Sequence, residues 1–111
     1  MNFDEYQTLA SRTANFKGRD AEYALMYLCM GLAGESGEVI EKIKKIIRNK
    51  DGELLPEDKR LLSHELGDVM WYLSQLARQL DIPFSEVAQA NIQKLEDRAG
   101  RNVIISEGDT R

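Results

Sequence analysis

The sequence predicts an all-α fold, a four- to five-helix bundle with two central helices that carry acidic residues. Apolar residues recur every three or four positions over most of the chain, and the only two prolines stand in short stretches that break this rhythm. With 111 residues, the chain is long enough for one core and too short for a second domain. We therefore expect a single domain, 1–111, with its core over about 20–100 and a C-terminal tail over 101–111.

The first half of the chain predicts two helices. The first is expected over 3–13, because Asn2 can cap it, and a loop that contains Gly18 follows. The second is expected from its cap, Asp20, to about residue 48, and it is long. Its apolar stripe consists of Ala21, Leu25, Leu28, Leu32, Val39, Ile43 and Ile47.

The second half predicts two more helices. A turn over 49–52 leads to a third helix over 56–80, which begins with a proline. Its apolar stripe consists of Leu62, Leu66, Val69, Leu73, Leu76 and Leu80. Ser85 is the expected cap of a fourth helix that ends near Gly100. Residues 101–111 fit a strand, a lid or a tail equally well.

Composition excludes several classes of function. The chain has 19 acidic against 15 basic residues, a formal net charge of −4, which argues against a general nucleic-acid binder. One cysteine and one histidine provide neither a disulfide nor a zinc site. No leader and no apolar stretch of membrane-spanning length is present, so we expect a cytoplasmic protein with no membrane partner.

A five-residue phrase of acid, any residue, glycine, acid and valine occurs once in each central helix, at 35–39 and 65–69. At about 100° per residue, the first acid of each phrase lies roughly 60° from the middle of its apolar stripe, and the second roughly 120° to the same side. Antiparallel packing of the two helices would bring these flanks together. The expected cluster consists of Glu35, Glu38, Glu65 and Asp68.

Such a cluster needs a counter-charge. At an effective dielectric constant of 20, two unit charges about 5 Å apart repel by about 3 kcal/mol. Protonation, a nearby Lys or Arg, or a bound cation can offset this repulsion. Oxygen ligands favour Mg²⁺, or Mn²⁺, over zinc. A di-iron site is disfavoured, because the only histidine, His64, follows Leu61 where that site requires a glutamate.

Glycines in the two central helices point away from the apolar stripes. Each mid-helix glycine costs about 1 kcal/mol relative to alanine, so we expect them to allow another helix to approach closely. The residues in question are Gly34, Gly37 and Gly67, and Trp71 points outward as well. This pattern predicts a homodimer or homotetramer.

At these residues the chain resembles the MazG-type, all-α nucleoside triphosphate pyrophosphohydrolases, relatives of the dimeric dUTPases and the dCTP pyrophosphatase. The family motif is two adjacent Glu, two residues, a third Glu, a spacer and Glu-x-x-Asp. Glu35 and Glu38 match its second and third Glu, and Glu65 and Asp68 match its closing pair after 26 intervening residues. Gly34 replaces the first Glu. The resemblance runs from about residue 20 to 98.

The resemblance implies Mg²⁺-dependent cleavage of a nucleoside or deoxynucleoside triphosphate between its α- and β-phosphates, with the four acids as metal ligands. Glu38 is the first candidate to activate the attacking water, and Glu35 is the second. The fourth helix would contact phosphate, because Asn91, Lys94 and Arg98 share one face at spacings of three and four. The candidate nucleobase contacts are Gln7, Phe16, Tyr23 and Tyr72.

Two alternatives stay open. The chain fits a non-catalytic helical interaction module in which the acids pair with Lys42, Lys44 or Lys45. It also fits a hydrolase of another pyrophosphate-containing nucleotide, such as a phosphoribosyl-ATP-like metabolite. The base and sugar preference, the number of metal ions and the choice between dimer and tetramer stay open as well.

Overall fold

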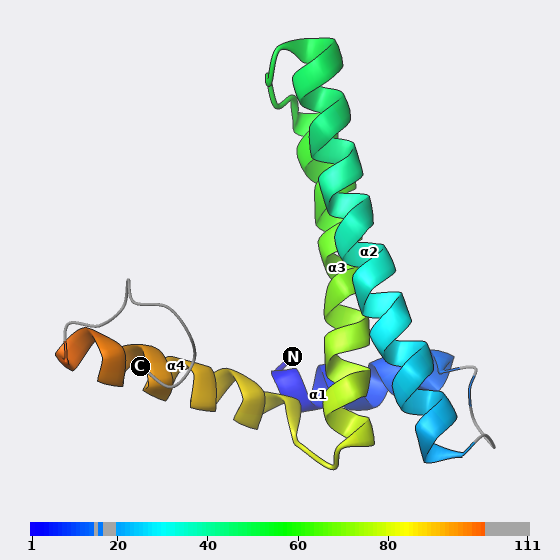
Figure 1. Ribbon diagram of the computed structural model, residues 1–111, viewed down its shortest axis with the longest axis vertical. Coiled ribbons are helices and arrows are strands. Elements are labelled where there is room, and N and C mark those ends of the chain that lie inside the picture. The colour runs from blue at the N-terminus through cyan, green and yellow to red at the C-terminus, as the bar shows by residue number, and fades with distance from the viewer. Residues whose placement is uncertain (15, 17–19, 102–111) are drawn as a thin grey trace.

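The protein is all-α, as predicted. The computed structural model describes residues 1–14, 16 and 20–101 (Figure 1). In chain order the elements are α1 (Phe3–Ala10), a 3₁₀ turn η1 (Ser11–Thr13), α2 (Ala21–Lys50), α3 (Pro56–Gln79) and α4 (Phe84–Gly100). No strand occurs in the described part. The predicted loop around Gly18 and the tail beyond residue 101 lie outside the described residues.

Helices α2 and α3 form a long antiparallel hairpin, the tall element of Figure 1. Two residues at its tip, Asp51 (φ 50°) and Gly52 (φ 79°), adopt the left-handed conformation that ends α2. Asp58 then ties the start of α3 to the end of α2. Its carboxylate accepts hydrogen bonds from Leu55 N (3.1 Å) and from Lys50 Nζ (2.7 Å). The hairpin is therefore closed at its tip by both backbone conformation and charge.

The predicted N-caps of the first two helices are confirmed. Asn2 and Glu5 form a reciprocal capping box, in which each side chain accepts a hydrogen bond from the other residue's backbone N–H (2.8 and 3.2 Å). The carboxylate of Asp20 accepts a hydrogen bond from Tyr23 N (2.8 Å). These short-range signals fix where α1 and α2 begin.

The predicted cap of the fourth helix, Ser85, is wrong. Helix α4 begins at Phe84 with Pro83 as its N-cap, two residues earlier than predicted, and Ser85 lies in its first turn. Asp4 of α1 accepts hydrogen bonds from Ser85 N (2.8 Å) and Ser85 Oγ (2.7 Å). One of the otherwise unpaired N–H groups at the start of α4 is thus satisfied by a carboxylate from another helix, which links the two helices.

Gln7 joins α1 to the junction of α3 and α4. Its side-chain nitrogen donates to the carbonyls of Ser74 (3.0 Å) and Ile82 (3.1 Å), and its side-chain oxygen accepts from Phe84 N (3.2 Å). Gln75 adds a hydrogen bond from its Nε2 to the carbonyl of Gln7 (3.2 Å). Because Gln7 is only 8% exposed and uses its polar atoms in these bonds, the prediction that it contacts a nucleobase is wrong.

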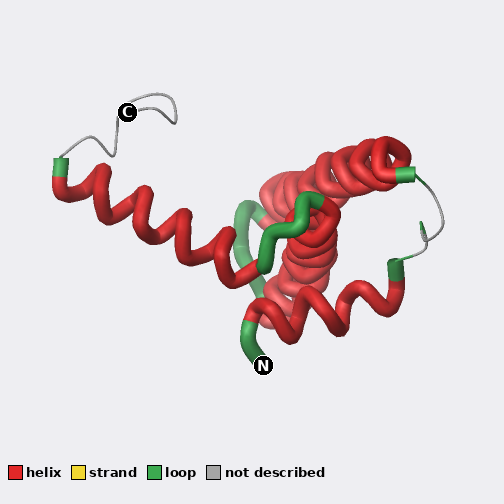
Figure 2. The backbone as a smooth tube through the Cα atoms, turned by 90° about the horizontal axis from the view of Figure 1, so that it is seen from below, coloured by secondary structure: helices red, strands yellow, loops and turns green. Residues whose placement is uncertain are grey.

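Helix α4 runs away from the hairpin after this anchored start. The ring of Phe84 is buried against Phe3 (centroids 5.3 Å apart) and Tyr6 (6.3 Å). Beyond it, α4 extends to one side (Figure 1), and the view from below shows that α1 and α4 leave the hairpin in different directions (Figure 2). A single chain therefore does not close α4 onto the acid-bearing helices.

The contact between α2 and α3 follows the predicted apolar stripes only in part. The stripe residue Leu28 of α2 is buried (0% exposed), but at the other end of the helix Ile46 is buried (7%) and the stripe residue Ile47 is 62% exposed. In α3, Leu66 (58%) and Leu80 (56%) are likewise exposed. Both helices are turned toward their acidic flanks relative to the prediction. The acids consequently face the hairpin seam, and part of each apolar stripe faces solvent.

Close packing at the seam depends on one glycine. A β-carbon at Gly31 would collide with the ring of Tyr72, whereas a β-carbon at Gly34 would have no atom within 4 Å. We predict that Gly31→Ala destabilises the protein by about 1–3 kcal/mol through overpacking. The matched control, Gly34→Ala, should be about 1 kcal/mol more stable than the parent, because alanine favours helix. Chemical denaturation measures both, and equal stability of the two variants would contradict this packing.

The Asp4 link predicts a pH dependence. The two hydrogen bonds from Ser85 lower the pKa of Asp4 below its ordinary value. A lowered folded-state pKa means that the stabilisation is complete above the ordinary aspartate pKa of about 3.9 and is lost as the pH falls through the folded-state value. Asp4→Ala should therefore lower the melting temperature at pH 7, and the difference from the parent should shrink at pH 3. A difference that stays constant with pH would show that the charge of Asp4 has no part in the link.

Candidate metal centre

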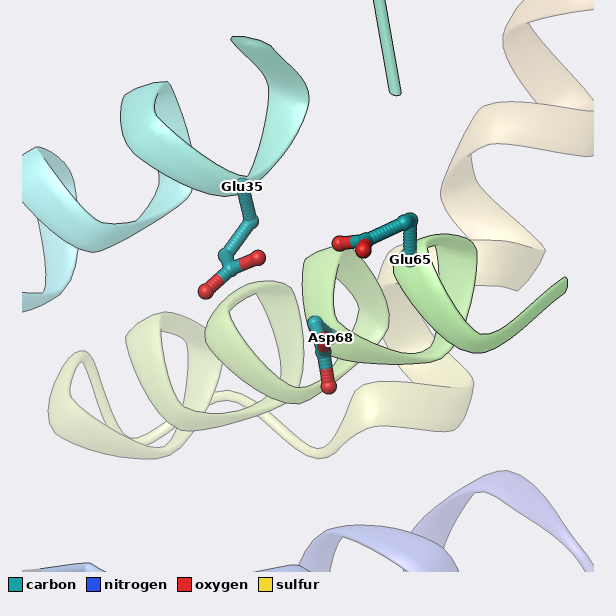
Figure 3. Close-up of side chains that lie close together, drawn as sticks. All are labelled: Glu35, Glu65 and Asp68. Atoms are coloured by element: carbon teal, nitrogen blue, oxygen red, sulfur yellow. The ribbon is translucent and has the colours of Figure 1, made fainter. Parts of the chain in front are cut away.

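Three acidic side chains converge across the α2–α3 seam. Glu35 of α2 and Glu65 and Asp68 of α3 each offer an oxygen, and these oxygens all lie within 4.8 Å of one another. Figure 3 shows Glu35 extending from α2 toward the two α3 residues. Glu35 and Glu65 are half-buried, and Asp68 is exposed. The group is thus partly exposed to solvent.

The repeated acidic phrase accounts for this convergence. Each phrase lies in the middle of its helix, and the antiparallel hairpin brings the two phrases opposite each other. Three of the four acids that the sequence predicts as a cluster are therefore brought together. The fourth, Glu38, is exposed one turn after Glu35 and does not belong to the group of three. Its role as a ligand stays a prediction.

The electrostatics of Glu35 reflect its crowded position. Burial, followed by the charges of Asp68, Glu65 and Glu38, raises the pKa of Glu35 above its ordinary value. One ammonium group contacts these carboxylates, because Lys42 Nζ is 3.5 Å from Glu65 Oε1. Carboxylate oxygens that repel one another at this spacing fit a hard divalent cation such as Mg²⁺.

Sequence reasoning gave Lys42 no place in the enzyme site, although a signal was present. Lys42 follows Glu35 by seven residues, two helical turns, and therefore shares its face of α2. The sequence predicts Lys42 only as a salt-bridge partner in the non-catalytic alternative. The structure places its ammonium group at the edge of the carboxylate group.

A cleft of about 280 Å³ opens beside the carboxylates. It is lined by Thr13, Tyr27, Glu35, Asp68, Trp71 and Tyr72. The rings of Trp71 and Tyr72 lie edge to face (centroids 4.9 Å apart), and Tyr27 lies 6.5 Å from Tyr72. Burial and the neighbouring Tyr27 raise the pKa of Tyr72, so its hydroxyl is protonated at neutral pH. The cleft thus combines an aromatic wall with two of the three acids.

Trp71 does not point outward, contrary to prediction. Its indole nitrogen donates to the carbonyl of Ala10 (3.1 Å) and to Thr13 Oγ1 (3.0 Å). The indole therefore packs α3 against the end of α1, and it carries no argument for an interface between copies. The glycines predicted to face another helix do lie in open surroundings, since a β-carbon at Gly34, Gly37 or Gly67 would meet nothing within 4 Å.

The predicted phosphate contacts lie elsewhere in the chain. Asn91 and Lys94 line a separate hollow of about 510 Å³ on α4, together with Ile82 and Glu86. Arg98 is only 4% exposed. Because α4 runs away from the hairpin, the structure does not bring these three residues to the carboxylates of the same chain (Figure 1). Their contact with substrate stays a prediction.

In the part of the chain that the structure describes, no helix is both long enough and apolar enough to span a membrane.

Comparisons with known proteins identify a family for this chain. The model of the MazG nucleotide pyrophosphohydrolase domain matches residues 25–102, which include both acidic phrases. The chain is also 49% identical over 114 residues to the Gene 37 protein of Mycobacterium phage L5, and the match covers 100% of both proteins. No solved structure matches significantly. The chain therefore belongs to the MazG nucleotide pyrophosphohydrolase family.

Proposed function

We propose that this protein hydrolyses a nucleoside or deoxynucleoside triphosphate between the α- and β-phosphates, releasing the monophosphate and pyrophosphate. The observation that carries the proposal is the meeting of Glu35, Glu65 and Asp68, with oxygens within 4.8 Å of one another, in a chain of the MazG family. A protein that kept these acids only for solubility would not need two matched phrases facing one another. We propose the clearing of nucleotides from the cellular pool as its role.

The three carboxylates would hold Mg²⁺, with Mn²⁺ as a substitute. When bound, the ion would neutralise phosphate charge and lower the pKa of a bound water. Phosphoryl transfer depends mainly on positioning and on charge neutralisation, so few other groups are required. Glu38 is exposed beside the three ligands and is the better placed base for the attacking water. Glu35 is less suited, because it is itself one of the group of three.

The aromatic cleft is the proposed place of the nucleoside. Tyr72 was a candidate nucleobase contact, and its ring lines the cleft that also contains Glu35 and Asp68. Aromatic rings provide flat surfaces on which bases stack. A nucleoside held against Tyr27 and Tyr72 would place its α-phosphate toward the carboxylates.

A second copy of the chain would complete the molecule. The radius of gyration is 16.9 Å, whereas a compact chain of this length has about 13 Å. Helix α4 extends away from the hairpin, which leaves apolar side chains uncovered (Figure 1). Large exposed apolar side chains on α2, α3 and α4 include Met26, Met30, Ile40, Leu66, Leu73, Val87 and Ile92.

The same association would bring the α4 residues to the acids. Because α4 diverges from its own hairpin, Asn91 and Lys94 would have to approach the hairpin of a second copy to contact phosphate. Their presence on the most divergent helix therefore favours a dimer, or a tetramer built from dimers. In such a dimer, Asn91 and Lys94 would still contact the substrate phosphates, but in the site of the other subunit.

The exposed apolar faces also favour the alternative of a non-catalytic interaction module. Under that alternative, the pair between Lys42 and Glu65 would be a structural salt bridge. Millimolar Mg²⁺ separates the two functions. A ligand cluster gains stability in proportion to the logarithm of ion concentration above its dissociation constant, and a salt bridge between helices does not. A melting temperature that does not respond to Mg²⁺ or Mn²⁺ would favour the module.

Removing single carboxylates tests the catalytic proposal. Glu65→Gln and Asp68→Asn should each lower Mg²⁺-dependent pyrophosphate release by more than about a hundredfold, because even groups that only support metal ligands are worth 10–100-fold. The Mg²⁺-dependent rise in melting temperature should disappear in the same variants. Release of pyrophosphate is measured with a panel of standard and damaged triphosphates.

The matched control for these variants is Glu57→Gln. Glu57 is an exposed acid of α3, the helix that carries Glu65 and Asp68; it pairs with Arg60 (2.6 Å) and lies outside the carboxylate group. Its loss should leave hydrolysis unchanged, because surface ion pairs contribute little. The proposal fails if no triphosphate yields pyrophosphate with either ion, or if Asp68→Asn is as active as Glu57→Gln. Release of pyrophosphate only from a phosphoribosyl-ATP-like nucleotide would instead favour the other hydrolase reading.

Mixing two inactive proteins tests the contribution of a second copy. Asp68→Asn removes an acid from the hairpin, and Lys94→Met removes an ammonium group from α4. If α4 serves the hairpin of a partner, mixed dimers contain one site with both defects and one site with neither, so up to about half of the parental activity per mixed dimer should return. Recovery is followed after co-refolding, and light scattering gives the oligomeric state. A monomer, or no recovery in proven mixed dimers, would contradict the arrangement.

A further inference from the structure

A small basic cavity lies next to the carboxylate group, toward the tip of the hairpin. It has a volume of about 170 Å³, and its polar lining consists of Lys42, Lys45, Asn49, Lys50 and Asp58. Ile46 and Leu61 provide its apolar part. The lining thus carries three ammonium groups and one amide against one carboxylate, a composition that would suit an anion, in a protein whose formal net charge is −4.

The cavity and the carboxylate group share one residue. Lys42 lines the cavity, and its Nζ lies 3.5 Å from Glu65 Oε1. Leu61, on the other wall, precedes Glu65 by one turn of α3. Along α2, Lys42 lies two turns, about 10 Å, beyond Glu35. An elongated anion with one end at the carboxylates would therefore extend along the seam into the cavity.

The cations of the cavity are held in different ways. Lys50 is fixed by Asp58, whose carboxylate lies 2.7 Å from its Nζ. Lys45 has a long contact of 3.8 Å with Glu41 and is 55% exposed. Among the ion pairs of the described residues, Lys42 has one partner, Glu65, which belongs to the proposed metal centre. A cation that neutralised Glu65 would weaken its attraction for Lys42 and leave that ammonium group available to a phosphate.

We propose that this cavity is the subsite for the terminal diphosphate of the substrate, with Lys42 and Lys45 as the groups that contact it. The proposal rests on the proposed triphosphate hydrolysis and adds the residues that receive the β- and γ-phosphates. These phosphates carry most of the substrate charge, and the α4 residues of the same chain are not near the hairpin seam. After cleavage, the same groups hold the leaving pyrophosphate, whose accumulating charge they neutralise.

Binding of inorganic pyrophosphate in the presence of Mg²⁺ tests the subsite directly by calorimetry. Lys42→Met and Lys45→Met should each weaken this binding about tenfold or more, as expected for loss of one charge-assisted hydrogen bond. In hydrolysis assays, the same variants should raise KM for triphosphates while binding of the nucleoside monophosphate stays unchanged. Circular dichroism establishes that each variant is folded.

Lys44→Met is the matched control. Lys44 lies between the two tested lysines in sequence, pairs with Glu41 and does not line the cavity. Its loss removes the same charge from the same helix, so it should leave pyrophosphate binding close to that of the parent. Equal weakening in all three variants would indicate only a general effect of charge and would overturn the subsite. Unchanged binding in Lys42→Met and Lys45→Met would overturn it as well.

The assays separate this inference from the proposed function. Hydrolysis of triphosphates by the parent protein tests the function, and the difference between Lys42→Met and Lys44→Met tests the subsite. An active parent with no difference between these variants leaves the function intact and overturns the subsite. A parent that hydrolyses no triphosphate and yet binds pyrophosphate through Lys42 and Lys45 overturns the function and supports an anion site in this cavity.

Discussion

Repulsion between the carboxylates at the α2–α3 seam is the constraint on which the rest of the structure depends. Glu35 is held half-buried beside Glu65 and Asp68, and each such pair costs on the order of 3 kcal/mol at an effective dielectric constant of 20. The hairpin must therefore be held together elsewhere. It is held at the tip by Asp58 and in the body by the contact of Gly31 with Tyr72. These anchors flank the acids on both sides along the hairpin. They keep the carboxylates close together even when no bound cation offsets their repulsion.

The rotation of the two helices shows why the sequence predicted the acids better than the core. Apolar periodicity identifies a face that leaves water, but it does not say whether the same chain or another copy covers that face. Ile47 and Leu66 belong to the predicted stripes and are exposed, while the seam itself runs closer to the acids. A helix that is covered on one face by its own chain and on another face by a second copy has a broad apolar stripe. The middle of that stripe points between the two covered faces and toward neither. The flank position of the acids could be predicted, because the repeat fixes it relative to its own helix.

Local signals were reliable where they act within one turn. Asn2 and Asp20 cap their helices as predicted, and Pro56 begins α3. The junction of α1, α3 and α4 could not be predicted, because it depends on hydrogen bonds between residues far apart in sequence, such as Gln7 with Ser74 and Asp4 with Ser85. The sequence around a glutamine in an amphipathic helix does not show whether its side chain is buried between helices or contacts a ligand. The direction of α4 depends on this junction, so it could not be predicted from the sequence either.

The charge distribution along α2 raises a competing explanation for its lysines. The basic residues follow the acids toward the C-terminus of the helix, where positive charge is favourable with the helix dipole whatever its other use. That effect falls off within the last turn and does not distinguish one face of the helix from another. Lys42 lies two turns before the end of α2 and faces the seam, whereas Lys44 pairs with Glu41 outside the cavity. The dipole therefore accounts for a basic end of the helix, but it does not account for an ammonium group placed against the acids, where an anionic substrate would need it.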